Sequence, residues 1–402
     1  MTSLLTTGFP ESVSTPPSAP PAAVRRSVGD RLRPPLRANW PVLVVLALFA
    51  AAAAVVPTLL PIATTDDWAY SRSAQILLAE GRLEIFPVVA ATAVFQVVWG
   101  AFFGLLFGPE LGVFRLSTVV MTALGAVALY GLCRSLGATA SRAALGVAAF
   151  LFNPIAFALA FSFMTDPHFA ALLLMATLLY VRGLEPGASR DHIPDRDRDR
   201  DRDRNRYRAV VAGSAVAALA LLTRQQGVLI PLAVASYLLL SGRLRFNRAS
   251  LAMLLRVGGI PAATAIGYYL WLRFFNDVPA VQASFLRRAI DTGWGGTANL
   301  VWRLTWIEVV YLGLFTLPVV AAALPALRRL LAPLAPSGLL VLLAWQAVVV
   351  GGAAAAWASG ARMPYIGQFF GSGGIGPPDV LGSRPTLLDA TARGWLTVVC
   401  AA

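Results

Sequence analysis

The sequence contains no lysine, so its 33 permanently basic side chains are all arginine. Charged residues of either sign make up only 13% of the 402 residues, whereas soluble domains carry about 25%. Apolar residues account for 57% of the chain. This shortage of charge excludes an ordinary soluble domain and predicts an integral membrane protein.

Cysteine and histidine are also scarce, with two residues of each. Cys133 and Cys400 lie far apart, in or beside apolar runs, which excludes a disulfide framework and the spacing of a metal site. His168 and His192 are too few for a histidine-rich metal centre. No Walker motif is present, which argues against ATP hydrolysis by this chain.

Arginine is concentrated in the N-terminal tail and in loops, and the formal net charge is +13. This placement indicates membrane topology rather than nucleic-acid binding. Residues Met1–Asn39, rich in Ser, Thr, Pro and Arg, are predicted to be a disordered cytoplasmic tail. Residues 40–402 are predicted to form one transmembrane domain, in which the first apolar run, Trp40–Ile62, is a retained anchor.

Regularly spaced apolar runs predict an all-α fold, a polytopic transmembrane bundle of about 10–11 helices. The chain ends inside a new apolar run, Trp395–Ala402, so we expect a C-terminal truncation. The runs between the anchor and this end are Pro87–Phe107, Val113–Leu132, Ala143–Phe163, Pro167–Val181, Ala209–Leu222, Gly227–Leu240, Val257–Phe274, Trp306–Leu324 and Leu339–Trp357.

The charge of the loops predicts which ends of these helices face the cytoplasm. The arginine-rich loops Arg182–Arg208 and Gly242–Arg256 are predicted to be cytoplasmic, which places the turn Thr223–Gln226 outside. Counting backwards along the chain also places Thr165–His168 outside. Asp166 is therefore expected on the same side as the loop that follows the anchor.

The number of apolar runs between Asp67 and Asp166 is three, although two residues on one side need an even number of crossings. Two explanations remain open at this stage. Asn153-Pro154, a strong break signal, splits one run into two short helices, or Pro87–Phe107 is partly re-entrant.

An acidic pair, Asp66-Asp67, directly follows the anchor. We expect it to begin a short interfacial helix over Asp67–Ala79, with Thr65 as its N-cap and Gly81 as its stop. Negative charge is favourable in the first turn of a helix, so one interpretation is that the pair only caps it. A carboxylate pair at the edge of a membrane also suits a general base, and we favour this functional interpretation.

Further candidates for a binding site lie on the predicted external side. Arg115 enters an apolar run and needs an anion, unless it only reaches the interface. Arg224 suits a phosphate, which arginine binds through two parallel hydrogen bonds, and Gln225 suits sugar hydroxyls. The remaining predicted site residues are Asp166, His168, Tyr70, Arg72, Arg362 and Tyr365.

These motifs, in their order and spacing, resemble the GT-C membrane glycosyltransferases, in the protein O-mannosyltransferase and aminoarabinose-transferase (ArnT-like) branch. The resemblance covers roughly Trp40–Leu240. Only Pro87 stands where many members carry a Lys-Pro-Pro-Leu or His-Pro-Pro-Leu segment. The matching motifs are the acidic pair with Tyr70, then Arg72, the Phe107-Gly108 turn leading to Arg115, and Thr165-Asp166.

The resemblance implies a GT-C-like fold, a polyprenyl-phosphate-linked sugar donor and a catalytic base in the acidic pair. We therefore expect a glycosyltransferase in which Asp66, Asp67 and Asp166 are catalytic and the other candidates bind substrate. The expected location is the bacterial cytoplasmic membrane, with the active site on its extracytoplasmic face. The acceptor is a glycan, a lipid or a protein.

Alternative functions use the same residues. The main alternative is a transporter or flippase of a lipid-linked sugar, in which the carboxylates and arginines form a binding and proton-coupling site. A non-catalytic scaffold for envelope assembly is a weaker one. No cofactor is predicted, although a carboxylate pair is able to hold Mg²⁺ or Mn²⁺.

Overall fold

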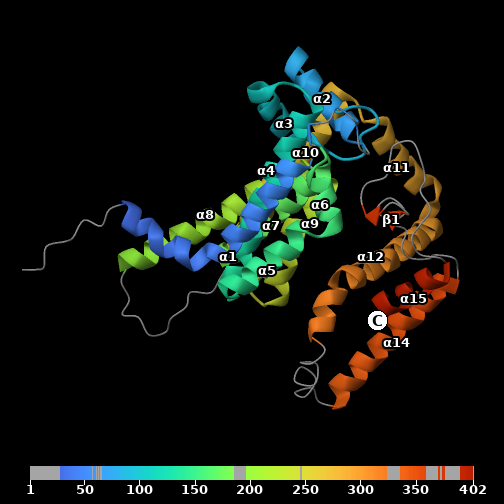
Figure 1. Ribbon diagram of the computed structural model, residues 1–402. Helices are drawn as coiled ribbons and strands as arrows, with labels where there is room; N and C mark the ends of the chain where they lie inside the picture. The colour runs from blue at the N-terminus through green and yellow to red at the C-terminus, as the bar shows by residue number, and fades with distance from the viewer. Residues whose placement is uncertain are drawn as a thin grey trace, which may run out of the picture. The chain divides into compact units, whose positions relative to one another are not determined.

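The computed structural model of the chain consists almost entirely of helices (Figure 1). It describes residues 28–56, 58–59, 61, 63, 66–184, 196–244, 247–323, 336–358, 370–371, 374–375 and 390–401. The chain divides into two units, Met1–Trp40 and Pro41–Ala402. In the first unit, helix α1 begins at Val28, inside the segment predicted to be a disordered tail. Residues 1–27 of that tail lie outside the described part, so the predicted division of the chain stays a prediction.

The all-α class is confirmed in the described residues. The one sheet there is the antiparallel pair β1 (Phe370–Gly371) and β2 (Gly374–Ile375). The helices are α1 (Val28–Val55), α2 (Asp67–Glu80), α3 (Val94–Phe107), α4 (Leu111–Ser135), α5 (Ala140–Leu151), α6 (Pro154–Ala160), α7 (Thr165–Leu184), α8 (Arg196–Leu221), η1 (Gln225–Val228), α9 (Leu229–Leu240), α10 (Arg248–Trp271), η2 (Leu272–Asn276), α11 (Ala280–Asp291), α12 (Gly293–Ala323), α14 (Pro336–Ala358) and α15 (Ala390–Ala401).

Four helical stretches in the described residues are long and apolar enough to cross a membrane, or five if the bent pair α5–α6 counts as one span. This finding agrees with an integral membrane protein. The predicted total of ten or eleven spans stays a prediction. The four stretches are Leu111–Ser135, Thr165–Leu184, Arg248–Asn276 and Gly293–Leu317, and the shorter apolar helices are Asn39–Val55, Val94–Phe107, Gln225–Leu240 and Gly338–Gly352.

Helix α2 follows the boundaries expected for the interfacial helix closely. It begins at Asp67 and ends at Glu80, one residue beyond the prediction. Gly81 closes it in the left-handed region, at φ 65°, with its N–H donating to the Leu77 carbonyl. Only glycine adopts this conformation without a steric cost, which is why Gly81 stops the helix. Thr65, the predicted N-cap, lies outside the described residues, and Asp66 occupies the N-cap position.

Helix α3 starts and ends at the same end of the bundle, beside α2 (Figure 1). The N–H of Ala93, at its start, donates to the carbonyl of Thr223 over 3.0 Å. Just beyond its end, the Pro109 carbonyl accepts from the Gln75 amide on α2 over 3.2 Å. With 14 residues, α3 is about 21 Å long, too short for a span of about 30 Å. The re-entrant alternative is therefore the one that the structure supports.

The predicted break at Asn153-Pro154 is also present. Asn153 caps α6, because its side-chain oxygen accepts from the backbone N–H groups of Ile155 and Ala156. Pro154 follows at the first helical position, where its missing N–H costs nothing. The chain bends by 67° between α5 and α6. With α3 not crossing, α4 and the bent pair α5–α6 supply an even number of crossings between Asp67 and Asp166.

The centre of the bundle is a cluster of buried side chains from α4, α7, α8, α9 and α10. Small residues let the helices approach closely. A Cβ atom added at Gly125 on α4 would lie 2.8 Å from the Cβ and 2.9 Å from the Cα of Ala171 on α7. One added at Gly183 would lie 2.6 Å from the Val210 side chain on α8. Small residues at such crossings are typical of membrane helices, whose association depends on close packing.

Gly125→Ala is expected to destabilise the bundle by about 1–3 kcal/mol, because the added methyl group meets the α7 backbone and forces the two helices apart. Thermal unfolding of the purified protein in detergent measures the change. Gly259→Ala on α10 is the matched control, since nothing lies within 4 Å of an added Cβ there. Equal melting temperatures for the two variants would contradict the close approach of α4 and α7.

Candidate active site

The acidic pair is divided between two environments by the start of α2. Asp67 is 0% exposed and accepts from Arg115 on α4, whose Nε and Nη2 both donate to Asp67 Oδ2, at 2.9 and 2.7 Å. Arg115 itself is only 3% exposed. The anion that this buried arginine was predicted to need is therefore a carboxylate of the protein itself.

Asp66 is exposed, although it is the immediate neighbour of Asp67. It occupies the N-cap position of α2 but its side chain makes no cap hydrogen bond. The interpretation that the acidic pair only caps a helix is therefore unsupported for Asp66. Two adjacent carboxylates have different tasks here: Asp67 joins α2 to α4, and Asp66 remains accessible to a ligand.

The second ion pair joins the start of α7 to the turn after α8. Arg224 Nη1 donates to Asp166 Oδ1, and also to the Thr165 hydroxyl over 3.2 Å. This pair is more open than the first, with side-chain exposures of 29% for Arg224 and 43% for Asp166. An ion pair that solvent reaches can exchange its partner for a ligand, whereas the Asp67–Arg115 pair is closed.

Tyr70 connects the two parts of the site. It lies one helical turn after Asp66, is 6% exposed, and forms a side-chain hydrogen bond with Thr165 on α7. Burial raises the pKa of the Tyr70 hydroxyl above its usual value, and the Thr165 hydrogen bond opposes this shift. The charges of Asp166 and Asp66 raise the Tyr70 pKa further, and the charge of Arg224 lowers it.

A loop between α2 and α3 covers this end of the bundle, and three amides hold it. Gln225 Nε2 donates to the Ala90 carbonyl over 2.8 Å, so this amide, predicted to bind substrate, contacts the backbone. Gln282 on α11 donates to the Ala91 carbonyl over 2.9 Å, and Asn276 accepts from the Ile85 N–H over 2.8 Å. The sequence analysis missed Gln282 and Asn276, because nothing in a single polar residue indicates a partner about 190 positions away.

His168 is fully buried on α7 rather than facing the site. Its Nδ1 lies 3.0 Å from the Met164 carbonyl, and its ring forms a T-shaped pair with Phe163 at a centroid distance of 5.9 Å. Gln96 on α3 donates to the neighbouring Phe163 carbonyl over 2.6 Å. In this arrangement His168 supports the turn before α7, and its predicted role in substrate binding stays a prediction.

Three predicted site residues remain. Arg72 is exposed on α2. Arg362 and Tyr365 lie outside the described residues. Within the described part of the chain, no group of three or more His, Cys, Asp or Glu side chains has the arrangement of a metal site. The prediction of a site without a cofactor therefore stays a prediction.

A long apolar cavity runs from this end of the bundle along α7 and α9. Its volume is about 720 Å³, and the end nearest the candidate active site is at Gln226, two residues after Arg224. It is lined mainly by α7 and α9. Its lining residues are Leu136, Phe169, Leu173, Thr177, Tyr180, Val181, Leu184, Gln226, Leu229, Ile230, Ala233, Val234 and Tyr237.

Together, the spans and the site define an all-helical integral membrane protein with carboxylates and arginines gathered at one end. No family model matches the sequence, and no curated protein matches it. Two crystal structures of ArnT from Cupriavidus metallidurans are similar. The apo structure has a TM-score of 0.41 at 19% identity, and the structure bound to undecaprenyl phosphate has a TM-score of 0.44 at 18% identity. Each match covers 80% of this chain and spans 66% of the ArnT chain. The sequence analysis named the same ArnT-like branch as a resemblance.

Asp67→Asn is expected to destabilise the protein by about 3–5 kcal/mol, because it leaves the buried Arg115 charge without its counter-charge. Replacing both partners, as in Asp67→Leu/Arg115→Met, should recover much of the loss. Unfolding of the purified variants in detergent measures both effects.

Glu80→Gln is the control for this prediction, since it removes the carboxylate of an exposed pair with Arg82. Exposed ion pairs contribute little, so no measurable change is expected. A stability of Asp67→Asn as high as that of Glu80→Gln would contradict a closed, desolvated pair.

Proposed function

We propose that this protein is a membrane glycosyltransferase that moves a sugar from a polyprenyl-phosphate donor to an extracytoplasmic acceptor. The observation that carries the proposal is the partly open Arg224–Asp166 ion pair, which lies next to the end of an apolar cavity. The accessible carboxylate Asp66 starts the helix that carries Tyr70, which hydrogen-bonds Thr165 beside this pair. A donor with a charged phosphate and a long hydrocarbon tail needs a cationic group for the phosphate and an apolar cavity for the tail. The acceptor is a hydroxyl of a glycan, a lipid or a protein, and the membrane is the bacterial cytoplasmic membrane.

The proposed reaction is a single displacement. Asp66, the accessible carboxylate of the pair, takes the proton of the acceptor hydroxyl as its oxygen bonds to the anomeric carbon. The bond from that carbon to the donor phosphate breaks, and its electron pair leaves with the phosphate oxygen. Arg224 stabilises the charge of the departing polyprenyl phosphate. Asp67, held by Arg115, is a positioning residue that fixes the start of α2 and so the place of Asp66.

The Arg224–Asp166 pair suits the changing charge of such a site. Without donor, Asp166 neutralises the Arg224 guanidinium. When a phosphate binds Arg224, Asp166 loses its partner and becomes available to sugar hydroxyls. An ionised carboxylate only accepts hydrogen bonds, and the hydroxyls donate them. Thr165, which accepts from Arg224, and Tyr70, which hydrogen-bonds Thr165, orient the pair toward the ligand.

The apolar cavity along α7 and α9 is the proposed place of the polyprenyl tail. Gln226 at its end is two residues from Arg224, so a phosphate on the arginine would have its tail at the mouth of the cavity. Apolar walls are suited to a hydrocarbon chain, and about 720 Å³ falls in the size range of ligand cavities.

Asp66→Asn is expected to lower the rate of sugar transfer by about 10²–10⁴-fold, because the amide cannot accept the hydroxyl proton. The measurement is release of polyprenyl phosphate from a labelled polyprenyl-phosphate sugar by the purified protein. Glu80→Gln, an exposed carboxylate at the far end of α2, is the control and should leave the rate unchanged. Translocation of the labelled lipid across a vesicle membrane without phosphate release would instead identify a flippase.

Ala233→Trp is expected to raise the KM for a long-chain donor several-fold and to leave the KM for a short-chain analogue unchanged. The indole would fill the cavity where the tail is proposed to lie, away from the reacting atoms. Leu232→Trp is the matched control, because Leu232 is exposed on the same helix and does not line the cavity. Equal KM values for both variants with the long donor would contradict this place for the tail.

A further inference from the structure

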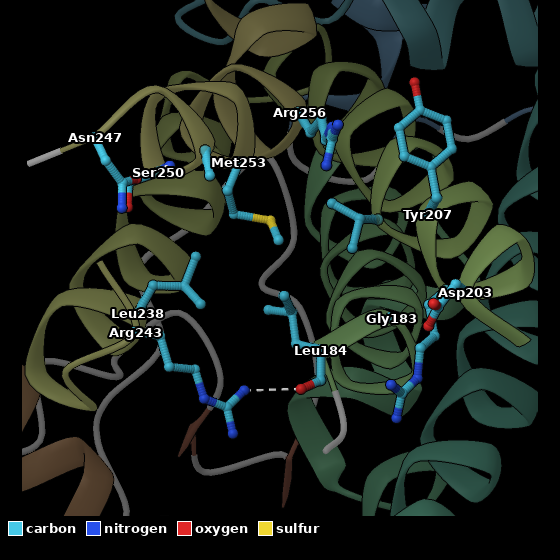
Figure 2. A pocket seen from close by; sticks show the side chains of 13 residues that line it. Gly183, Leu184, Asp203, Tyr207, Leu238, Arg243, Asn247, Ser250, Met253 and Arg256 are labelled. Carbon is cyan, nitrogen blue, oxygen red and sulfur yellow. Dashed lines mark hydrogen bonds between the residues drawn. The ribbon is translucent and has the colours of Figure 1, made fainter. Parts of the chain in front are cut away.

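A second cavity, with charged walls, lies toward the other end of α7, about one helix length or roughly 30 Å from the candidate active site. Its volume is about 520 Å³. It forms where the end of α7, the first half of α8, the end of α9 and the start of α10 meet (Figure 2). These segments include both loops that the arginine content predicts to be cytoplasmic. The mechanism proposed above does not use this cavity.

The walls carry three arginines, Arg206, Arg243 and Arg256, and one carboxylate, Asp203, so the cavity is net positive. Arg243 donates to the Leu184 carbonyl over 2.8 Å, the dashed line in Figure 2. Arg256 lies over the ring of Tyr207, with its guanidinium carbon 4.9 Å from the centroid. Both arginines are thus held by neutral groups, and neither pairs with a carboxylate among the described residues. Their charge remains available to an anion.

The start of α10 contributes further polar groups to the same wall. Asn247 caps the helix by accepting from the Ser250 N–H over 2.9 Å, and both side chains line the cavity. The beginning of a helix carries partial positive charge, which favours an anion near it. Figure 2 shows Asn247 and Ser250 on the opposite side of the cavity from Tyr207 and Asp203.

The rest of the lining is apolar, and this decides what kind of anion fits. Leu184, Val210, Leu238 and Met253 lie among the charged residues. Gly183 lets α7 and α8 approach closely here, because a side chain at this position would clash with Val210. A small hydrated anion makes no favourable contact with these apolar side chains. A phospholipid does, because its phosphate lies directly beside hydrocarbon.

We propose that this cavity binds the phosphate headgroup of an anionic phospholipid from the cytoplasmic leaflet. Arg243 and Arg256 contact the phosphate, Ser250 and Asn247 reach the polar part of the headgroup, and the apolar side chains receive the first carbons of the acyl chains. Basic cavities between helices at the cytoplasmic surface suit such lipids. The site is independent of the proposed sugar transfer, so its test needs no turnover.

The test measures binding of phosphatidylglycerol to the purified full chain in a neutral detergent, by native mass spectrometry. Arg243→Gln/Arg256→Gln should weaken binding by about tenfold or more. Arg204→Gln/Arg248→Gln removes the same charge from exposed positions outside the cavity and should bind as the unchanged protein does. Phosphatidylcholine, which has no net charge, should bind at least tenfold more weakly than phosphatidylglycerol.

A second variant tests the cavity without removing charge. Ala249→Trp places an indole in the lining and should weaken phosphatidylglycerol binding even if the double arginine variant does not fold. Glycerol 3-phosphate, which has the phosphate but no acyl chain, separates a lipid site from a site for free phosphate. The proposal is overturned if glycerol 3-phosphate binds as tightly as the lipid, if both arginine pairs lose affinity equally, or if Ala249→Trp binds normally.

Discussion

The buried ion pair between Asp67 and Arg115 is the constraint on which the candidate active site depends. Among the salt bridges of the described residues, it is the only one that joins α2 to α4, and both side chains are buried. An enclosed pair is costly to form, because both charges lose their water. What it supplies is a fixed position. It sets where α2 begins, and the start of α2 decides that Asp66 faces outward and that Tyr70 reaches Thr165.

The rest of the site follows from this anchor and divides into buried and open residues. Tyr70 and Thr165 are nearly enclosed, whereas Arg224 and Asp166 are partly open. The order runs from structural support inside to accessible charge outside. Such a gradient combines preorganisation with access, since the groups that a ligand displaces are the ones that solvent already reaches.

Much of this arrangement was predictable from local signals, and the remainder was not, for physical reasons. Gly81, Asn153 and Pro154 act on their immediate neighbours, so their effects on helix ends are readable in the sequence. The loop charge, which acts independently of packing, predicted a common side for Asp66, Asp67 and Asp166, and their helices begin at the same end of the bundle. The partner of Arg115 was not predictable, because a buried arginine accepts any anion, including a ligand. Gln282 donates to a backbone carbonyl and Asn276 accepts from a backbone N–H. Nearly every residue carries both groups, so no residue type indicates the targets of these two side chains.

Helix α3 has a consequence for the membrane around the protein. Both of its ends are tied to one end of the bundle, and its side chains Val98, Phe102, Leu105 and Phe107 are exposed. Such a helix displaces hydrocarbon from a single leaflet, over a footprint on the order of 200 Å². The two leaflets beside the protein then differ in area. A helix inserted in one leaflet enters more easily where that leaflet is stretched or convex. The curvature of the membrane therefore influences where this protein accumulates.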